Sequence, residues 1–345
     1  MKKVLLICGL LLILITSNLW AEYFYVRTFS ADVGPGPIAV SQNPTTTDCY
    51  YATFANLTSN IYYVPDFLTS VDSTDQRLIA GPFVFVASRG FQGIALDSAD
   101  NVFISGDNSG GSPTGIFRKY APNVSKTTWT QDVTFAPDNT LRYAGCALLN
   151  DNRIVASITA PIPTQPKVLS TADGSSIADL PTPVGTRYGR EPTFNPDNND
   201  IYQGFNGLGV GTNTFEVYKD GDPTNPGNYT LDSTTLFADS IAATVAKNHN
   251  GYDKINHQLL HIDTQNKMLE IYDVNTTLRG AASINTTPVQ TIDLMPFNVG
   301  TSPFDVVHTQ VDGKDYLIIT DYGMGVDQIY VFGPPPTKAK TWMVY

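Results

Sequence analysis

Glutamate is scarce in this sequence, and so is the residue spacing that an amphipathic helix needs. Only four of the 32 acidic residues are glutamates, so aspartate supplies nearly all of the acid. Aspartate is typical of turns and loop ends rather than of helix faces. After residue 21, no long window shows apolar residues recurring at i, i+3, i+4 and i+7. These absences argue against a helical protein and favour strands joined by Asp-rich turns.

Charge is also sparse, at 15% of the residues, and its balance is acidic, with a formal net charge of −11. No cluster of lysine and arginine is visible, so we expect no nucleic-acid partner and no binding to an anionic membrane surface. Hydrophobic residues reach 42%, which excludes a disordered chain. The 18 tyrosines and 17 phenylalanines favour strands, and the composition therefore predicts an all-β globular protein.

One long apolar run occurs, and it lies at the N-terminus. Two lysines precede the run Val4–Ile15, polar residues follow it, and Ala21 offers a cleavage point. The run is short for a membrane span. We therefore predict a signal peptide over residues 1–21, a secreted, periplasmic or cell-surface location, and no membrane insertion after cleavage. Cys8 suggests a lipoprotein as the alternative, but Ile7 is not the small residue that lipid attachment prefers.

A loose repeat runs through the rest of the chain. Each unit opens with Gly or Pro, forms a short apolar strand, turns on Asn, Asp or Gly, and continues into a strand rich in aromatic and β-branched residues. The clearest copy has strands at 93–97, 101–106 and 115–120. The other units open at Gly36, Gly145 and Arg190, near a turn at Tyr252–Lys254, and at Ser302.

Six such units, each of roughly 45–60 residues, suit the four-stranded blades of a β-propeller. We predict a six-bladed β-propeller over residues 22–333. The strand-like segment 22–30 has no unit of its own, so we expect it to supply the outer strand of the last blade and close the ring. The tail 334–345 begins with three prolines and is either disordered or a final strand.

Only two cysteines, Cys49 and Cys146, remain after the predicted leader. An oxidising compartment would permit a disulfide between them. The repeat assigns them to blades that are not neighbours, which places them beyond the roughly 7 Å that a disulfide can span. We expect two buried thiols, with a bridge as the alternative.

The second unit resembles an NHL repeat in its letters, with Gly-Ile-Ala-Leu-Asp at 93–97 followed by Asn-Val-Phe-Ile at 101–104. The sixth unit is similar in outline, from Ser302-Pro303-Phe304 to the tip at Thr320-Asp321. Across residues 31–333 the resemblance lies in the spacing of strands and turns more than in the residues themselves. It implies a propeller, a fold that hosts binders, lactonases and structural modules alike.

Polar residues near one end of the channel are the natural candidates for a site, because inner-strand starts and loops converge there. Glu191 stands out as one of the few glutamates, directly before Pro192, where it could bind Ca²⁺ or a sugar hydroxyl. The alternative for Arg190 and Glu191 is a salt bridge to a neighbouring blade, and for an Asp or Asn candidate it is an Asx-turn. The candidates are Gln92, Arg190, Glu191 and Asp305 near inner-strand starts, and Asp107, Asn108, Asn206, Asp263 and Asp321 beyond second strands.

Our leading hypothesis is a module that binds an unknown protein or small-molecule ligand at the channel mouth or at the loops 105–114 and 204–214, without a cofactor. The sequence shows no G-x-S-x-G, H-E-x-x-H or phosphate-binding motif. His257 and His261 lie on a predicted strand, about 13 Å apart, too far to share a metal.

Two alternatives remain open. Resemblance to the six-bladed, calcium-dependent lactonases and gluconolactonases implies a hydrolase whose metal is held by Glu191, Asn206 and either Asp263 or Asp321. The third hypothesis is a purely structural cell-surface module.

Overall fold

The computed structural model describes residues 23–335, except 33, 55–57, 86–89, 109–114, 161–164, 184–186, 208–213, 220, 223, 233–249, 264–265, 296–302 and 323–326. The predicted signal peptide and nearly all of the C-terminal tail lie outside these residues. Within the described part, no helix is both long and apolar enough to cross a membrane.

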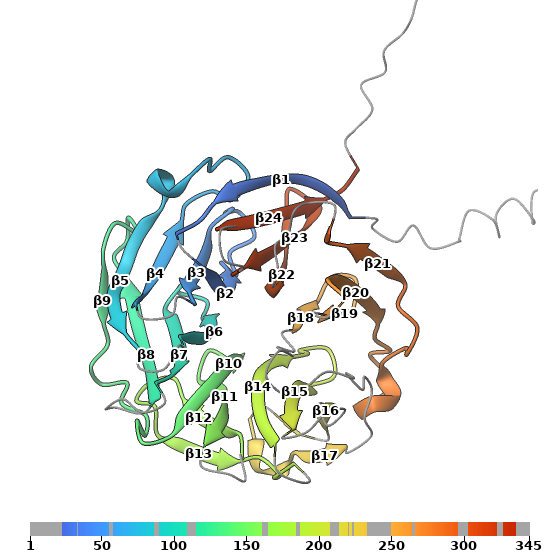
Figure 1. Ribbon diagram of the computed structural model, residues 1–345. Coiled ribbons are helices and arrows are strands. Elements are labelled where there is room, and N and C mark those ends of the chain that lie inside the picture. Colours follow the sequence, from blue (N-terminus) through green and yellow to red (C-terminus); the bar gives the residue numbers. More distant parts are fainter. Residues whose placement is uncertain are drawn as a thin grey trace, which may run out of the picture.

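Six four-stranded antiparallel sheets, counted over the described residues, stand around one axis, so the chain is a six-bladed β-propeller (Figure 1). From the axis outward, the first three blades are β2 (Pro35–Val40), β3 (Cys49–Thr53), β4 (Thr58–Val64) and β5 (Arg77–Val84); β6 (Phe91–Leu96), β7 (Val102–Asp107), β8 (Gly115–Pro122) and β9 (Trp129–Gln131); β10 (Arg142–Asn150), β11 (Arg153–Ala160), β12 (Lys167–Ser170) and β13 (Ser176–Asp179).

The remaining blades are β14 (Arg187–Phe194), β15 (Ile201–Gly207), β16 (Thr214–Lys219) and β17 (Thr230–Asp232); β18 (Asn250–Asp253), β19 (Gln258–Asp263), β20 (Met268–Asp273) and β21 (Gln290–Asp293); β22 (Pro303–Val311), β23 (Lys314–Asp321), β24 (Gln328–Gly333) and β1 (Phe24–Ser30). Short 3-10 turns occur at η1 (Ser73–Asp75), η2 (Pro226–Asn228) and η3 (Gly280–Ser283).

The N-terminal strand closes the ring, as predicted. β1 pairs antiparallel with β24 and lies outside it, so the first and last parts of the described chain share one blade (Figure 1). The Arg27 guanidinium on β1 donates hydrogen bonds to the carbonyls of Leu68 and Ser70 in the first blade. Nearer the axis, the Thr320 hydroxyl donates to the carbonyl of Gly36 at 2.6 Å. Side chains of the last blade therefore fasten it to the first at two depths.

Short polar side chains close the turns that follow the inner strands, which confirms the predicted Asp- and Asn-rich turns. The Asp97 carboxylate accepts from the backbone N–H of Ala99 at 3.0 Å and of Asn101 at 2.9 Å. Such Asx-turns replace backbone hydrogen bonds that a tight turn cannot make. The same position in three other blades is occupied by Asn150, Asn195 and Asp253.

The fifth blade corrects one predicted boundary. Tyr252 and Asp253, placed in a turn by the sequence, belong to β18, where Tyr252 pairs with Leu259 and Asp253 with Gln258. The turn begins only at Lys254. The Asp253 side chain does accept N–H groups of the turn, as a turn residue would. Its backbone, however, still pairs in the sheet.

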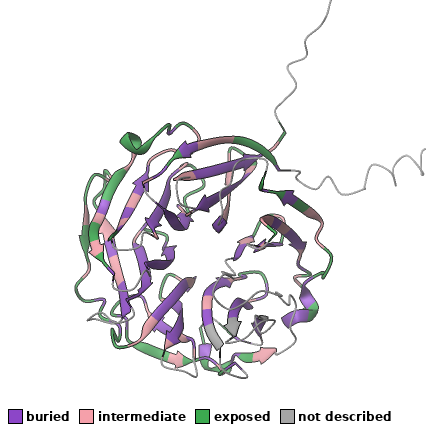
Figure 2. Cartoon of the chain, viewed as in Figure 1, coloured by how far each residue is buried: buried purple, intermediate pink, exposed green. Residues whose placement is uncertain are grey.

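The core lies between the blades, where aromatic side chains fill the space between neighbouring sheets. Inner strands are buried along most of their length, whereas the outer strands carry exposed residues (Figure 2). Cys49 on β3 and Cys146 on β10 are buried free thiols, as predicted. The fully buried tyrosines are Tyr50, Tyr51, Tyr143, Tyr202, Tyr218 and Tyr330.

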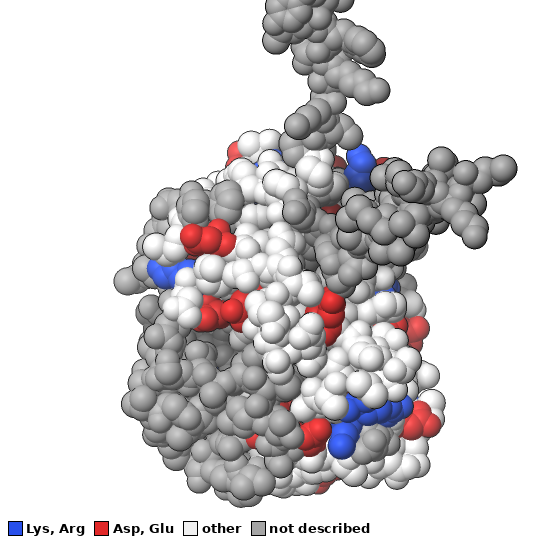
Figure 3. All heavy atoms as spheres, turned by 90° about the vertical axis from the view of Figure 1, so that its right-hand side faces the viewer, with Lys and Arg blue, Asp and Glu red and all other residues white. Residues whose placement is uncertain are grey.

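Charged groups are dispersed over the surface. On the side of the ring drawn in Figure 3, lysine and arginine atoms of the described residues lie in small separate groups among larger uncharged areas. Elsewhere on the described surface, Lys126 pairs with Asp48 and Asp100 at 2.6 and 2.5 Å.

Ring closure predicts unequal effects for two phenylalanines on β1. Phe29 is 1% exposed and packs in a cluster that joins the last blade to the first, whereas Phe24 is 40% exposed. We expect Phe29→Ala to lower the free energy of unfolding by about 3–5 kcal/mol in urea titrations, because a large buried side chain is lost. Phe24→Ala is the matched control, and equal effects of the two substitutions would contradict this account of closure.

Candidate functional site

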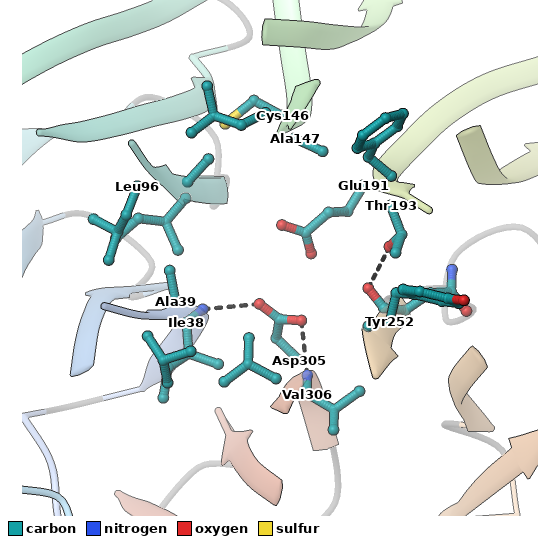
Figure 4. A pocket seen from close by; sticks show the side chains of 18 of the residues that line it. Ile38, Ala39, Leu96, Cys146, Ala147, Glu191, Thr193, Tyr252, Asp305 and Val306 are labelled. Atoms are coloured by element: carbon teal, nitrogen blue, oxygen red, sulfur yellow. Dashed lines mark hydrogen bonds between the residues drawn. The ribbon is translucent and has the colours of Figure 1, made fainter. Parts of the chain in front are cut away.

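The six inner strands surround an axial cavity of about 250 Å³ that is lined by residues of every blade (Figure 4). Each inner strand contacts the next around the axis, from β2 through β22 and back to β2. Two further cavities, of about 300 and 250 Å³, adjoin this one, because all three share Gln42 and Tyr252 in their linings. We call the three together the axial recess.

Asp305 on β22 projects into the axial cavity (Figure 4). Its carboxylate accepts the backbone N–H of Ile38, on the first blade, at 2.8 Å and that of Val306 at 2.7 Å. The pairing of β22 with β23 shifts register between Pro303 and Asp305. Such an irregularity re-aims a side chain that regular pleating would direct elsewhere. Asp305 therefore serves both the channel wall and the junction between first and last blades.

Glu191 on β14 points into the same cavity from another blade (Figure 4). The register of β14 also shifts nearby, between Gly189 and Pro192. Pro192 has no N–H to offer a neighbouring strand, which suits it to this irregular pairing. The backbone of Ile94, two blades away, contributes a hydrogen bond that favours the Glu191 carboxylate.

Two glycines allow the backbones around Glu191 to approach closely. A Cβ atom on Gly93 of β6 would lie 2.5 Å from the Cα of Gly145, and one on Gly145 of β10 would lie 2.5 Å from the Cα of Glu191. Real Cβ atoms do not tolerate such distances, so only glycine fits. As a result β6 and β14 come into contact on either side of β10.

The two carboxyl groups of the cavity are hard to ionise together. Glu191 is 6% exposed and Asp305 is 2% exposed. Burial raises the pKa of Glu191 well above its usual range, and the negative charge of Asp305 adds to this effect. Burial also raises the pKa of Asp305 to about 7, against the opposing effect of the Ile38 and Val306 N–H groups. Near neutral pH, the pair therefore carries less than its full negative charge.

Of the other predicted site residues, Asp107 and Asp263 have structural partners. Asp107, at the end of β7, accepts two hydrogen bonds from the Arg142 guanidinium of the next blade, at 2.7 and 2.8 Å. Asp263, at the end of β19, accepts from the backbone and side-chain nitrogens of Asn266 at 2.9 and 2.6 Å. These contacts join two blades and cap a turn, respectively.

The remaining predicted residues also sit outside the described lining of the axial cavity. Asp321 is fully buried at the end of β23, and Gln92 and Asn108 are buried beside β6 and β7. Arg190 is half-buried on β14, and its carbonyl accepts from the Gln203 amide at 3.2 Å. Asn206 lies on β15, but its side chain is outside the described residues. The described residues contain no group of three or more His, Cys, Asp or Glu side chains that could hold a metal ion.

Sequence reasoning missed the residues around the opening of the recess. Gln42 lies just beyond β2 and Phe194 ends β14, whereas Tyr252 and His308 lie in the second halves of β18 and β22. Their one signal in the sequence is position, a few residues after a predicted inner-strand start. His308 is held in place, with Nδ1 3.2 Å from Asp253 and Nε2 3.3 Å from Asp315.

No protein-family model matches the chain, and no curated protein matches it. Among solved structures, the β-propeller domain of Cps50 (Swd1) from Myceliophteria thermophila is similar with a TM-score of 0.50 and 9% identity, over 91% of this chain and 100% of that one. A chain of a nidogen/laminin complex gives a TM-score of 0.47 and 14% identity, over 79% and 89%. The first similarity supports the propeller fold and nothing finer.

The raised pKa values predict a pH-dependent cost of folding. Both acids bind protons more tightly in the folded than in the unfolded protein, so their contribution to stability is lost as the pH rises, for Asp305 through about 4 to 7. The variant Glu191→Gln/Asp305→Asn lacks both titrations. The difference in the free energy of unfolding, variant minus wild type, measured in urea, should therefore increase by about 1 kcal/mol or more from pH 4 to pH 8. A constant difference across this range would contradict the expectation.

The close approach at Gly145 predicts a second effect. We expect Gly145→Ala to lower the free energy of unfolding by about 1–3 kcal/mol, because the added methyl group meets the backbone of Glu191. Gly227→Ala is the matched control, since a Cβ there has no atom within 4 Å. Equal stabilities of the two variants in thermal unfolding would show that the backbone yields at Gly145.

Proposed function

We propose that this protein is an exported binding module that takes a protein partner at the axial recess. The observation that carries the proposal is the continuity of the three cavities across the channel mouth. A single concave site at the centre of a rigid ring is the usual place for a ligand in such a fold. Export rests on the N-terminal leader that the sequence predicts.

The surroundings of the recess have the composition of an interaction surface. Phe194 and Tyr252 are half-buried aromatic residues, and Pro44, Pro196 and Lys254 are exposed beside them. Aromatic side chains at the centre of an interface, with polar groups around them, supply most of the binding energy in protein complexes.

Hydrogen bonds already orient side chains of the recess in the free protein. The Tyr252 hydroxyl donates to Asp197 at 2.5 Å, and Asp197 also lies 2.8 Å from Nδ1 of His257. The Gln42 amide donates to the carbonyl of Leu96, in the next blade, at 2.7 Å. Side chains fixed in advance lose little conformational entropy on binding, which favours affinity.

A recess-filling variant tests the proposal. Peptides selected from a displayed random library on the immobilised wild-type protein would be measured against Ala147→Phe, whose new ring enters the axial cavity. We expect at least a tenfold loss of affinity, about 1.4 kcal/mol. Ala121→Phe, on β8 outside the recess, is the matched control and should bind as the wild type does. Equal binding by folded Ala147→Phe would exclude the recess as the site.

A further inference from the structure

We infer that the axial recess recognises a lysine or arginine side chain of the partner protein, whose cationic end reaches Glu191 and Asp305. The inference rests on the proposed function, because it names the chemical group that the recess accepts. It follows from the depth of the cavity, the character of its walls and the charge at its base.

The two carboxyl groups lie deep in the recess. Glu191 lies in the middle of β14 and Asp305 near the start of β22, and Phe194 and His308 lie three residues further along the same strands. Three residues of strand span about 10 Å. A group bound by both carboxylates therefore lies deep in the channel, below the surface on which a partner's backbone would rest.

The wall between opening and base is apolar. Ile38, Leu96 and Val306 line the cavity from three different blades (Figure 4). Lysine and arginine join an aliphatic stem to a charged end, so the stem can pack on such a wall while the end stays with polar groups. A bare metal ion or a short ammonium compound would leave the wall unused.

The charge at the base complements a cation, and the described lining supplies none. Neither lysine nor arginine occurs among the described residues of the axial cavity, whose other titratable groups are Cys146, Tyr252 and His308. Tyr252 donates to Asp197, and both His308 nitrogens face aspartates behind the wall. An inserted ammonium or guanidinium group would make charge-assisted hydrogen bonds with the two carboxylates.

Such binding is linked to protons. The cation favours the ionised form of the Glu191–Asp305 pair, whose pKa values burial raises in the empty recess. Affinity should therefore increase from pH 5 to pH 8, and binding in calorimetry should release protons to the buffer.

Peptide pools with one fixed position test the inference. Acetylated, amidated pentapeptides with random residues around a central lysine, arginine, norleucine or glutamate would be titrated onto the intact protein at pH 8. Norleucine keeps an aliphatic stem and lacks the charge. We expect the lysine or arginine pool to bind at least tenfold more tightly than the norleucine pool, and equal binding of the three pools would overturn the inference.

Variants of Glu191 and Asp305 test whether these two carboxyl groups cause the preference for a cation. In Glu191→Gln/Asp305→Asn the preference for a cationic centre should fall below twofold, and in Glu191→Gln alone it should fall in part. The matched control Glu270→Gln/Asp179→Asn carries the same substitutions on β20 and β13, away from the recess, and should keep the full preference. Near-ultraviolet circular dichroism checks that each variant is folded. The comparison of the peptide pools on the wild type does not depend on any variant. A preference that persists without the base carboxylates would also overturn the inference.

The two proposals fail in different ways. If Ala147→Phe abolishes peptide binding but the central residue does not matter, the recess is the site and the cation is not its ligand. If n-butylammonium alone binds as tightly as the lysine pool, the ligand is a free amine rather than a protein side chain, which overturns the inference.

Discussion

The ring must close for any of this geometry to exist, and closure depends on pairing between the two ends of the folded chain. β1 pairs with β24, so the last blade cannot be completed until the first residues of the fold return to it. Because an open ring would leave β24 as an unpaired edge, this pairing also removes a surface prone to association. The same junction carries the Asp305–Ile38 hydrogen bond, which joins closure to the channel wall.

In the closed ring the inner strands contact one another around the axis, and most of them pair irregularly with the next strand of their blade. The pairing of β2, β6, β10, β14 and β22 with their neighbours shifts register near each strand's start. At Gly93 and Gly145 the crowding permits no side chain at all. Glu191 and Asp305 lie at these irregular positions, so the crowding that the fold imposes also aims the two carboxylates at the axis.

The architecture was predictable from the sequence because it repeats. The same order of an apolar strand, a turn rich in Asn, Asp or Gly, and an aromatic strand recurs in six units, so one degenerate copy, such as the unit at Tyr252, does not hide the repeat. Glu191 could be found as a rare glutamate before a proline. Its convergence with Asp305 could not, since 114 positions separate them and only the ring brings them together. The residues around the opening escaped notice because each is an ordinary strand-end residue until six blades assemble.

Burying two carboxyl groups beside each other opposes folding, which makes their presence informative. A fold that needed only a hydrogen-bond acceptor for Ile38 could use a neutral side chain, and apolar residues line most of the same wall. Uncompensated buried charge costs more than a well-packed apolar substitute. The free protein limits that cost by retaining protons on the pair, and a cationic group entering the recess would compensate the charge directly. Bound protons and a bound cation would each reduce the cost of the same buried negative charge. Because the two compete, the proposed binding must depend on pH.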